Sequence, residues 1–119
     1  MTKYKEFDAR IPRPDYIEDA EAHIKKFGRI TGTSGITRVP GEILERLITR
    51  HINADWGDLN KEDRELNDHA LKREAGGRLL SSYKNAFNDQ TIWIITSGFG
   101  NDPDNVDLCH TTIMFPHEY

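Results

Sequence analysis

Histidines and carboxylates gather around the middle of the sequence, where a break between two helices is predicted. His51 precedes the break, Asp58 lies in it, and Asp63 and His69 follow it. An imidazole beside carboxylates can perform general acid–base catalysis or bind a divalent metal ion. However, Asp58 and Asp63 stand where turn and capping residues belong, and neither histidine has a second histidine four residues away. We therefore expect no catalytic residue and no metal site. The alternative is a small metal-dependent hydrolase or nuclease that uses Asp58, Asp63 and His69.

The segment 98–107 contains a second group of side chains that could bind a metal ion. It contains three Asp and two Asn, which carry the oxygen donors that calcium prefers. It lacks the turn glycine and the bidentate glutamate of an EF-hand loop. We interpret the segment as a turn-rich, solvated loop. Phe99, which stands between two glycines, is expected to be exposed there and to contact a partner.

Candidate nucleophiles stand in unfavourable contexts. Ser34 does not fit the Gly-x-Ser-x-Gly elbow, because Gly35 follows it immediately, and no lysine of a phosphate-binding P-loop is present. Cys109 and His110 are neighbours in a predicted strand, so their side chains should point to opposite faces. Cys109 is expected to be a small buried filler.

Aromatic residues are interpreted mainly as packing residues. Trp56 lies in a predicted turn and Trp93 in a predicted strand, and both are expected in the core; base stacking or an interface is the alternative. Tyr119 follows the last predicted strand and is expected to pack on Trp56 or Tyr83.

Three helices are predicted from apolar residues at helical spacing. The first begins at Pro14 and ends before Gly28, with acidic residues in its first turn and lysines in its last. The second follows Pro40 and should make the main helical contribution to the core. Its apolar stripe comprises Ile43, Leu44, Leu47, Ile48 and Ile52. The third covers about 61–75. Its narrow apolar face is formed by Leu66, Ala70 and Leu71.

The remaining segments favour strands. A strand bent by glycines is predicted at 29–39, and strands at 78–84, 91–97 and 108–115 should form a meander. The strand at 91–97 is apolar on both faces and is therefore expected to be central. One face holds Ile92, Ile94 and Thr96, and the other holds Trp93, Ile95 and Ser97. The predicted fold class is α+β: a small antiparallel sheet, made of a three-strand C-terminal meander and one earlier strand, covered by two to three helices.

The chain length, the net charge and the number of cysteines exclude several classes of protein. The 119 residues suffice for one domain, which we place at 29–119, behind an N-terminal arm and short helix at 1–28. A net charge of −4 argues against a broad basic surface, so a nucleic-acid partner is not expected. The single cysteine excludes an internal disulfide and fits a reducing compartment. Without an apolar run long enough for a membrane span or a signal peptide, a cytoplasmic protein is expected.

The N-terminal arm at 1–13 mixes apolar and basic residues without periodicity. Such a segment can become ordered on a partner. Tyr4, Phe7 and Arg10 are therefore candidate partner-binding residues, together with Phe99. The exposed edges of a small sheet also make a homodimer a possible assembly.

Several motifs resemble those of a family of short prokaryotic proteins described as hypothetical or plasmid-related. They include Trp-Gly-Asp-Leu at 56–59, a Thr-Thr pair at 111–112 and Pro-x-Glu-Tyr at 116–119. The resemblance covers about residues 29–119. Residues 1–28 are an addition, and 98–107 is longer than the family's connection.

This resemblance implies a setting in mobile genetic elements and implies no activity. Together with the residues themselves, it leads us to expect a non-catalytic protein-interaction module of a plasmid or phage. Such a module would modulate or inhibit a host defence protein and would need no cofactor.

Overall fold

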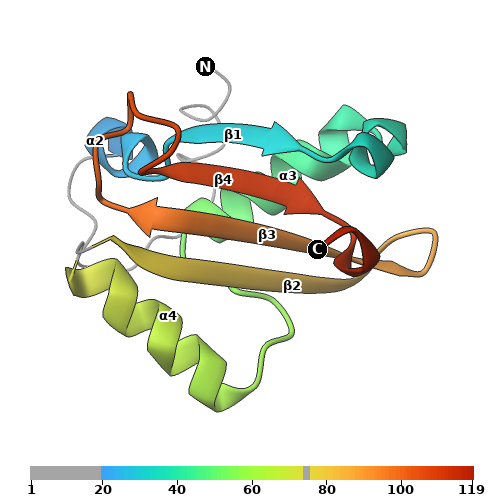
Figure 1. The fold of residues 1–119 in the computed structure, drawn as a ribbon. Coiled ribbons are helices and arrows are strands. Elements are labelled where there is room, and N and C mark those ends of the chain that lie inside the picture. The colour runs from blue at the N-terminus through green and yellow to red at the C-terminus, as the bar shows by residue number, and fades with distance from the viewer. Residues whose placement is uncertain (1–19, 74–75) are drawn as a thin grey trace.

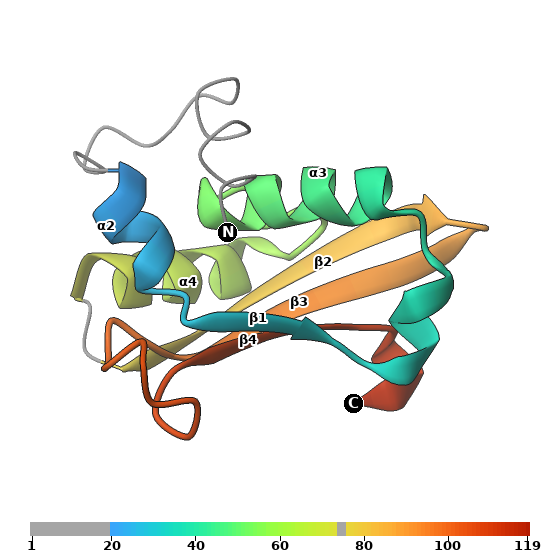
Figure 2. The same cartoon turned by 90° about the horizontal axis from the view of Figure 1, so that it is seen from above.

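The computed structural model describes residues 20–73 and 76–119. In this part of the chain, α-helices lie on one face of a four-stranded sheet (Figure 1, Figure 2). The strand order is β1-β4-β3-β2. These strands are β1 (Arg29–Gly32), β2 (Gly77–Phe87), β3 (Gln90–Phe99) and β4 (His110–Met114). The last three form the predicted antiparallel meander, and β1 runs parallel to β4. The α+β fold is thus confirmed.

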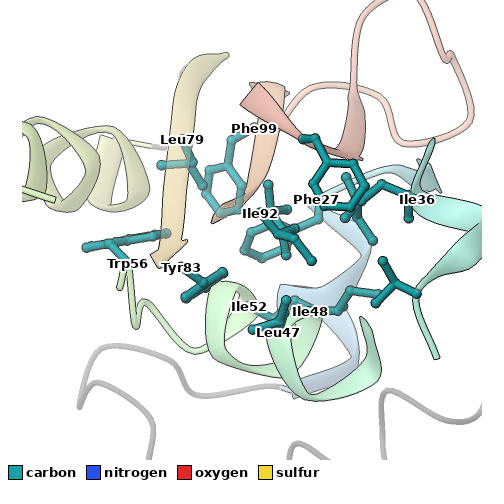
Figure 3. Packing of buried hydrophobic residues seen from close by; sticks show 14 of the residues in the cluster. Phe27, Ile36, Leu47, Ile48, Ile52, Trp56, Leu79, Tyr83, Ile92 and Phe99 are labelled. Carbon is teal, nitrogen blue, oxygen red and sulfur yellow. The ribbon is translucent and has the colours of Figure 1, made fainter. Parts of the chain in front are cut away.

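Helix α3 (Gly41–Ile52) supplies the main helical part of the core, as its apolar spacing predicts. It lies across the sheet, and Figure 3 shows its side chains facing residues of β2 and β3. Leu47, Ile48 and Ile52 are all at most 7% exposed and pack in one cluster with Ile92 of β3 and Tyr83 of β2. The burial of this stripe against the sheet is the principal hydrophobic contact between the two layers.

Helix α4 (Lys61–Arg73) confirms its predicted apolar face in part, because Leu71 is 3% exposed and Ala70 packs against the core cluster. Its start is as expected, because the Asp63 N–H donates to the Asn60 side chain at 2.8 Å. Leu66, however, is 67% exposed, whereas Asn67 is 4% exposed. The reason is that the Asn67 amide pairs with the edge of β2. It donates to the Leu80 carbonyl at 2.7 Å and accepts from the Leu80 N–H at 3.1 Å.

The turn between α3 and α4 covers the next part of the same edge. The Ser82 N–H donates to the Trp56 carbonyl at 3.0 Å, and the Asp58 N–H donates to the Ser82 carbonyl at 2.7 Å. Gly57, with a φ of 76°, allows this close approach, since a Cβ there would meet the Ser82 carbonyl. The Trp-Gly-Asp-Leu motif therefore closes the outer edge of β2.

The predicted strand at 29–39 is too long. Only β1 is extended, and a 3₁₀ helix, η1 (Ser34–Arg38), follows it and turns Ile36 into the core. The C-terminal 3₁₀ helix η2 (Pro116–Glu118) holds this turn in place. The Glu118 carboxylate accepts from the Thr33 hydroxyl at 2.6 Å and from the Gly35 N–H at 3.0 Å. The hydrogen bond from Thr33, followed by those from the Phe115 and Gly35 N–H groups, lowers the pKa of Glu118.

Helix α2 (Ala20–Lys25) confirms the described part of the first predicted helix, and Gly28, with a φ of 67°, lies in the turn that follows it. Residues 14–19 of that prediction lie outside the described residues. Phe27 follows α2 and is fully buried in the core (Figure 3).

Replacing Asn67 tests the junction between α4 and β2. Asn67→Ala leaves the N–H and carbonyl of Leu80 without their partner beneath the helix, so we expect a loss of about 2 kcal/mol in the free energy of unfolding. Urea denaturation measures this loss. Arg64→Ala, an exposed position on the same helix, is the control and should change stability by less than about 0.5 kcal/mol. Equal stability of the two variants would contradict the assignment.

Candidate functional site

Asp58, Asp63 and His69 occupy separate places in the structure. Asp58 accepts the Lys84 N–H at 2.8 Å on the edge of β2. Asp63 lies in the first turn of α4, and His69 is six residues further along that helix, a rise of about 9 Å. His69 is exposed beside a pocket of about 140 Å³ that Ala70, Arg73 and Gly77 also line. Among residues 20–73 and 76–119, no three His, Cys, Asp or Glu side chains lie together in a way that could hold a metal ion.

In the acidic loop after β3, side chains accept hydrogen bonds from backbone N–H groups of the same loop. The Asp102 carboxylate accepts the Asp104 N–H at 3.0 Å, and the Asn105 side chain accepts the Asp107 N–H at 3.1 Å. Every residue from 100 to 108 is exposed. This is the turn-rich, solvated loop that its composition predicts.

The expected exposure of Phe99 is wrong. Its side chain is 1% exposed, and its ring lies edge-on to that of Phe27 at 5.0 Å. The cause is a β-bulge: Leu79 pairs with Thr96 but Gly77 pairs with Phe99, so β3 carries one extra residue there. The bulge turns Phe99 towards the helices. The other partner-binding candidates, Tyr4, Phe7 and Arg10, lie outside the described residues.

The structure brings together a group of polar residues that the sequence analysis missed. The His51 imidazole lies under α3, with Nδ1 2.6 Å from Ser81 Oγ and Nε2 2.9 Å from Thr96 Oγ1. Thr96 Oγ1 is in turn 2.7 Å from Thr111 Oγ1, and Thr111 donates to the Phe27 carbonyl at 2.7 Å. All four side chains are at most 1% exposed. We call this group the His51 network.

The hydrogen-bond directions in the His51 network fix the state of the imidazole. Because Thr111 donates its one hydroxyl proton to Phe27, it must accept from Thr96, and Thr96 must then accept from His51 Nε2. His51 Nδ1 is left as the acceptor of the Ser81 hydroxyl. The network therefore holds a neutral imidazole protonated at Nε2.

A serine hydrogen-bonded to a histidine is also the core of many nucleophilic active sites. Here the pair is closed to substrate, because Ser81 is 0% and His51 1% exposed. The second nitrogen of His51 meets a threonine hydroxyl rather than the carboxylate that orients a catalytic imidazole. Aromatic rings of Phe27 and Trp56 lie edge-on to the imidazole at 5.4 and 5.6 Å. We therefore interpret the network as structural.

Burial sets the protonation of His51. Burial removes the water that would stabilise a charged imidazolium, and this effect, with a smaller electrostatic repulsion from His23, lowers the pKa of His51 to about 3. His23 is itself 5% exposed, with its Nε2 2.6 Å from the Ile52 carbonyl. One signal in the sequence could have located His51: it follows Leu47 by four residues and Ile48 by three, and so belongs to the buried stripe of α3.

The face of the sheet turned away from the helices is the second feature with functional potential (Figure 2). Strand pairing places Ser82, Trp93 and Met114 in one row across it. The next row consists of Leu80, Ile95, Thr112 and Thr31. We call this surface the open face. Ile95 and Met114 are buried hydrophobic residues that do not belong to the main core cluster, because they lie on this other side.

Tyr119 lies over the open face, not on Trp56 or Tyr83 as predicted. Its ring is 5.9 Å from that of Trp93, and the Arg78 guanidinium lies 5.8 Å from its centroid. Tyr119 is 75% exposed and Trp93 is half-buried, so Trp93 is not a core residue either.

Trp56 does lie in the core, at 3% exposure. Cys109 is fully buried, as expected of a filler.

Acidification tests the neutral state of His51. Between pH 6.5 and 3 the unfolded chain binds a proton at this histidine that the folded chain does not bind. The contribution of His51 to stability should therefore fall as the pH is lowered, with a slope of up to about 1.4 kcal/mol per pH unit. Urea denaturation from pH 7.5 to 5 measures this slope.

Two variants isolate the His51 contribution. His51→Asn should be less stable at pH 7.5 and should show a flatter pH dependence, because it removes the titrating group. Ser81→Ala removes one hydrogen bond of the same network but keeps the imidazole, so it should retain the wild-type slope. An unchanged slope in His51→Asn would refute the assignment.

Comparisons with known proteins identify no relative of this chain. No protein-family model, curated protein or solved structure matches the chain. Among the residues that the structure describes, no helix has the length and apolar character needed to cross a membrane.

Proposed function

We propose that this protein is a non-catalytic protein-interaction module and that the open face is its docking surface. The observation that carries the proposal is the cluster of Trp93, Tyr119 and Arg78 on a sheet face that the described helices leave uncovered. Tryptophan, tyrosine and arginine are the residue types that contribute most to binding energy at protein interfaces. Of the groups suited to catalysis, His51 and Ser81 are buried, Asp58 and Asp63 serve a turn and a helix start, and His69 is exposed six residues beyond Asp63 on the same helix.

The strand pattern of the open face supports this proposal. A sheet with one solvated face usually alternates apolar residues on the inside with polar residues on the outside. Strand β3 departs from this pattern, because Trp93 and Ile95 lie on the open face while Ile92 and Ile94 fill the core. Adjacent positions on β2 and β4 add Leu80 and Met114. Trp93 and Leu80 are half-buried and, with the exposed Tyr119, supply the accessible apolar surface, whereas Ile95 and Met114, at 6% and 8% exposure, contribute little to it.

The biological setting is proposed from the resemblance of residues 29–119 to plasmid-related proteins. We place the protein in a mobile genetic element and propose a host protein, such as a defence protein, as its partner. The proposal also places the protein in the cytoplasm, where the buried free thiol of Cys109 would remain reduced.

A second copy of the chain is the alternative partner, and the sheet edges bear on it. The turn at 56–58 and Asn67 occupy the outer edge of β2, whereas β1 has a strand neighbour on one side only within the described residues. An antiparallel pairing of two β1 strands about a two-fold axis would extend the sheet. A pocket of about 310 Å³ lies beside this edge, between β1, η1 and α3.

Capture from a nuclease-treated lysate of the source cells tests the open face as the docking surface. The wild-type chain should enrich a specific protein, and Tyr119→Ser should weaken that capture at least tenfold, because it removes an exposed aromatic anchor. Leu66→Ser is the matched control: Leu66 is 67% exposed on α4, away from the open face. Mass spectrometry quantifies the captured protein. Equal capture by the two variants would overturn the proposal.

A further inference from the structure

We infer that the partner of the open face is an acidic protein surface that presents an apolar group between carboxylates. This inference rests on the proposed function and adds the chemistry of the partner. The four strands carry Arg29, Arg78 and Lys84 and contain no Asp or Glu.

The three cations belong to the open face. Arg78 and Lys84 alternate along β2 with buried residues such as Leu79 and Tyr83, which lie on the helix side. Arg29 pairs in register with His110 of β4, whose partner on β3 is Ser97 of the open face. All three cations are exposed.

Within the described part of the chain none of the three cations forms an ion pair, although the Asp58 carboxylate lies beside Lys84 and accepts its backbone N–H at 2.8 Å. The ion pairs there join Arg50 with Asp55 and Lys61 with Glu65, and both lie on the helix side of the fold. The Arg78 guanidinium faces the Tyr119 ring. Arg29 shares a pocket of about 400 Å³ with Asp104, but the two side chains form no ion pair. The open face is thus basic on a protein whose net charge is −4.

The positions of these cations favour a protein partner over single-stranded nucleic acid and over a second copy of the chain. They lie on the edge strands, β1 and β2, whereas the central strands carry Trp93, Ile95 and Met114. An apolar centre with a charged rim is the anatomy of a protein interface. A platform for single-stranded nucleic acid would instead offer several exposed rings on which successive bases stack, whereas here Tyr119 is exposed and Trp93 is half-buried, edge-on to it. Two copies joined face to face would bring like charges together.

A titration of the ¹⁵N-labelled full chain with three defined probes tests the inference. The first is an 18-residue amphipathic peptide with Leu and Trp on one face and Asp and Glu on the other. The second replaces every Asp and Glu by Asn and Gln, and the third is the oligonucleotide dT20. We expect the acidic peptide to shift amide resonances on the open strands at 78–84, 93–97 and 110–114. Its Kd should rise at least fivefold between 50 and 300 mM NaCl.

A triple variant supplies the charge control. Arg29→Ala, Arg78→Ala and Lys84→Ala together should raise the Kd for the acidic peptide at least tenfold. The matched control combines Arg46→Ala, Lys61→Ala and Arg64→Ala on the helices and should leave the Kd within twofold. Thermal unfolding of both triple variants verifies that they fold.

The inference is overturned if the acidic peptide does not bind, if the amide peptide binds as tightly, or if dT20 binds the open face more tightly. Shifts that grow with protein concentration alone would show self-association through this face and overturn it as well. The proposed function fails separately, when capture from the lysate is insensitive to Tyr119→Ser. Capture that depends on Tyr119 but survives the triple substitution of the open face would overturn the acidic partner alone.

Discussion

The hydrogen bonds of the buried His51 imidazole are the constraint on which the remaining structure depends. They join α3 to β2 through Ser81 and to β3 through Thr96, and Thr111 extends them to β4 and to the Phe27 carbonyl. A buried polar group without a partner costs about 1–3 kcal/mol, so any other register would leave several such groups unsatisfied. The network thereby fixes the position of α3 on the sheet and the register of β2, β3 and β4.

The same alignment decides what the other face of the sheet presents. Because Thr96 and Ser81 point towards α3, Ile95 and Ser82 must point away, together with Trp93. The open face is therefore the complement of the His51 network. Because the turn at 56–58 and Asn67 occupy the outer edge of β2, the open face and the outer edge of β1 are the parts of the described sheet without a covering element. The imidazole and hydroxyl groups of the His51 network lie in the core, while the open face carries aromatic, aliphatic and basic side chains.

Patterns within single segments allowed much of this fold to be predicted. The stripe of α3 and the two-residue period of the last three strands depend on neighbours in sequence, and both are confirmed. The errors involve contacts between distant segments. Asn67 is buried because it pairs with Leu80, and Phe99 is buried because a bulge at Gly98 turns the strand. The His51 network joins four segments, so local patterns could place its members in the core but could not assemble them.

NMR of the imidazole nitrogens tests the central claim, that His51 is a structural and not a catalytic residue. Long-range ¹H–¹⁵N spectra of the folded protein between pH 8 and 4.5 should show a neutral ring protonated at Nε2 throughout, with the urea-unfolded chain as the titrating reference. An imidazolium that forms with a pKa between 5.5 and 8 would contradict the account. It would mean that protons reach the Ser81–His51 pair and that the pair is available for acid–base chemistry.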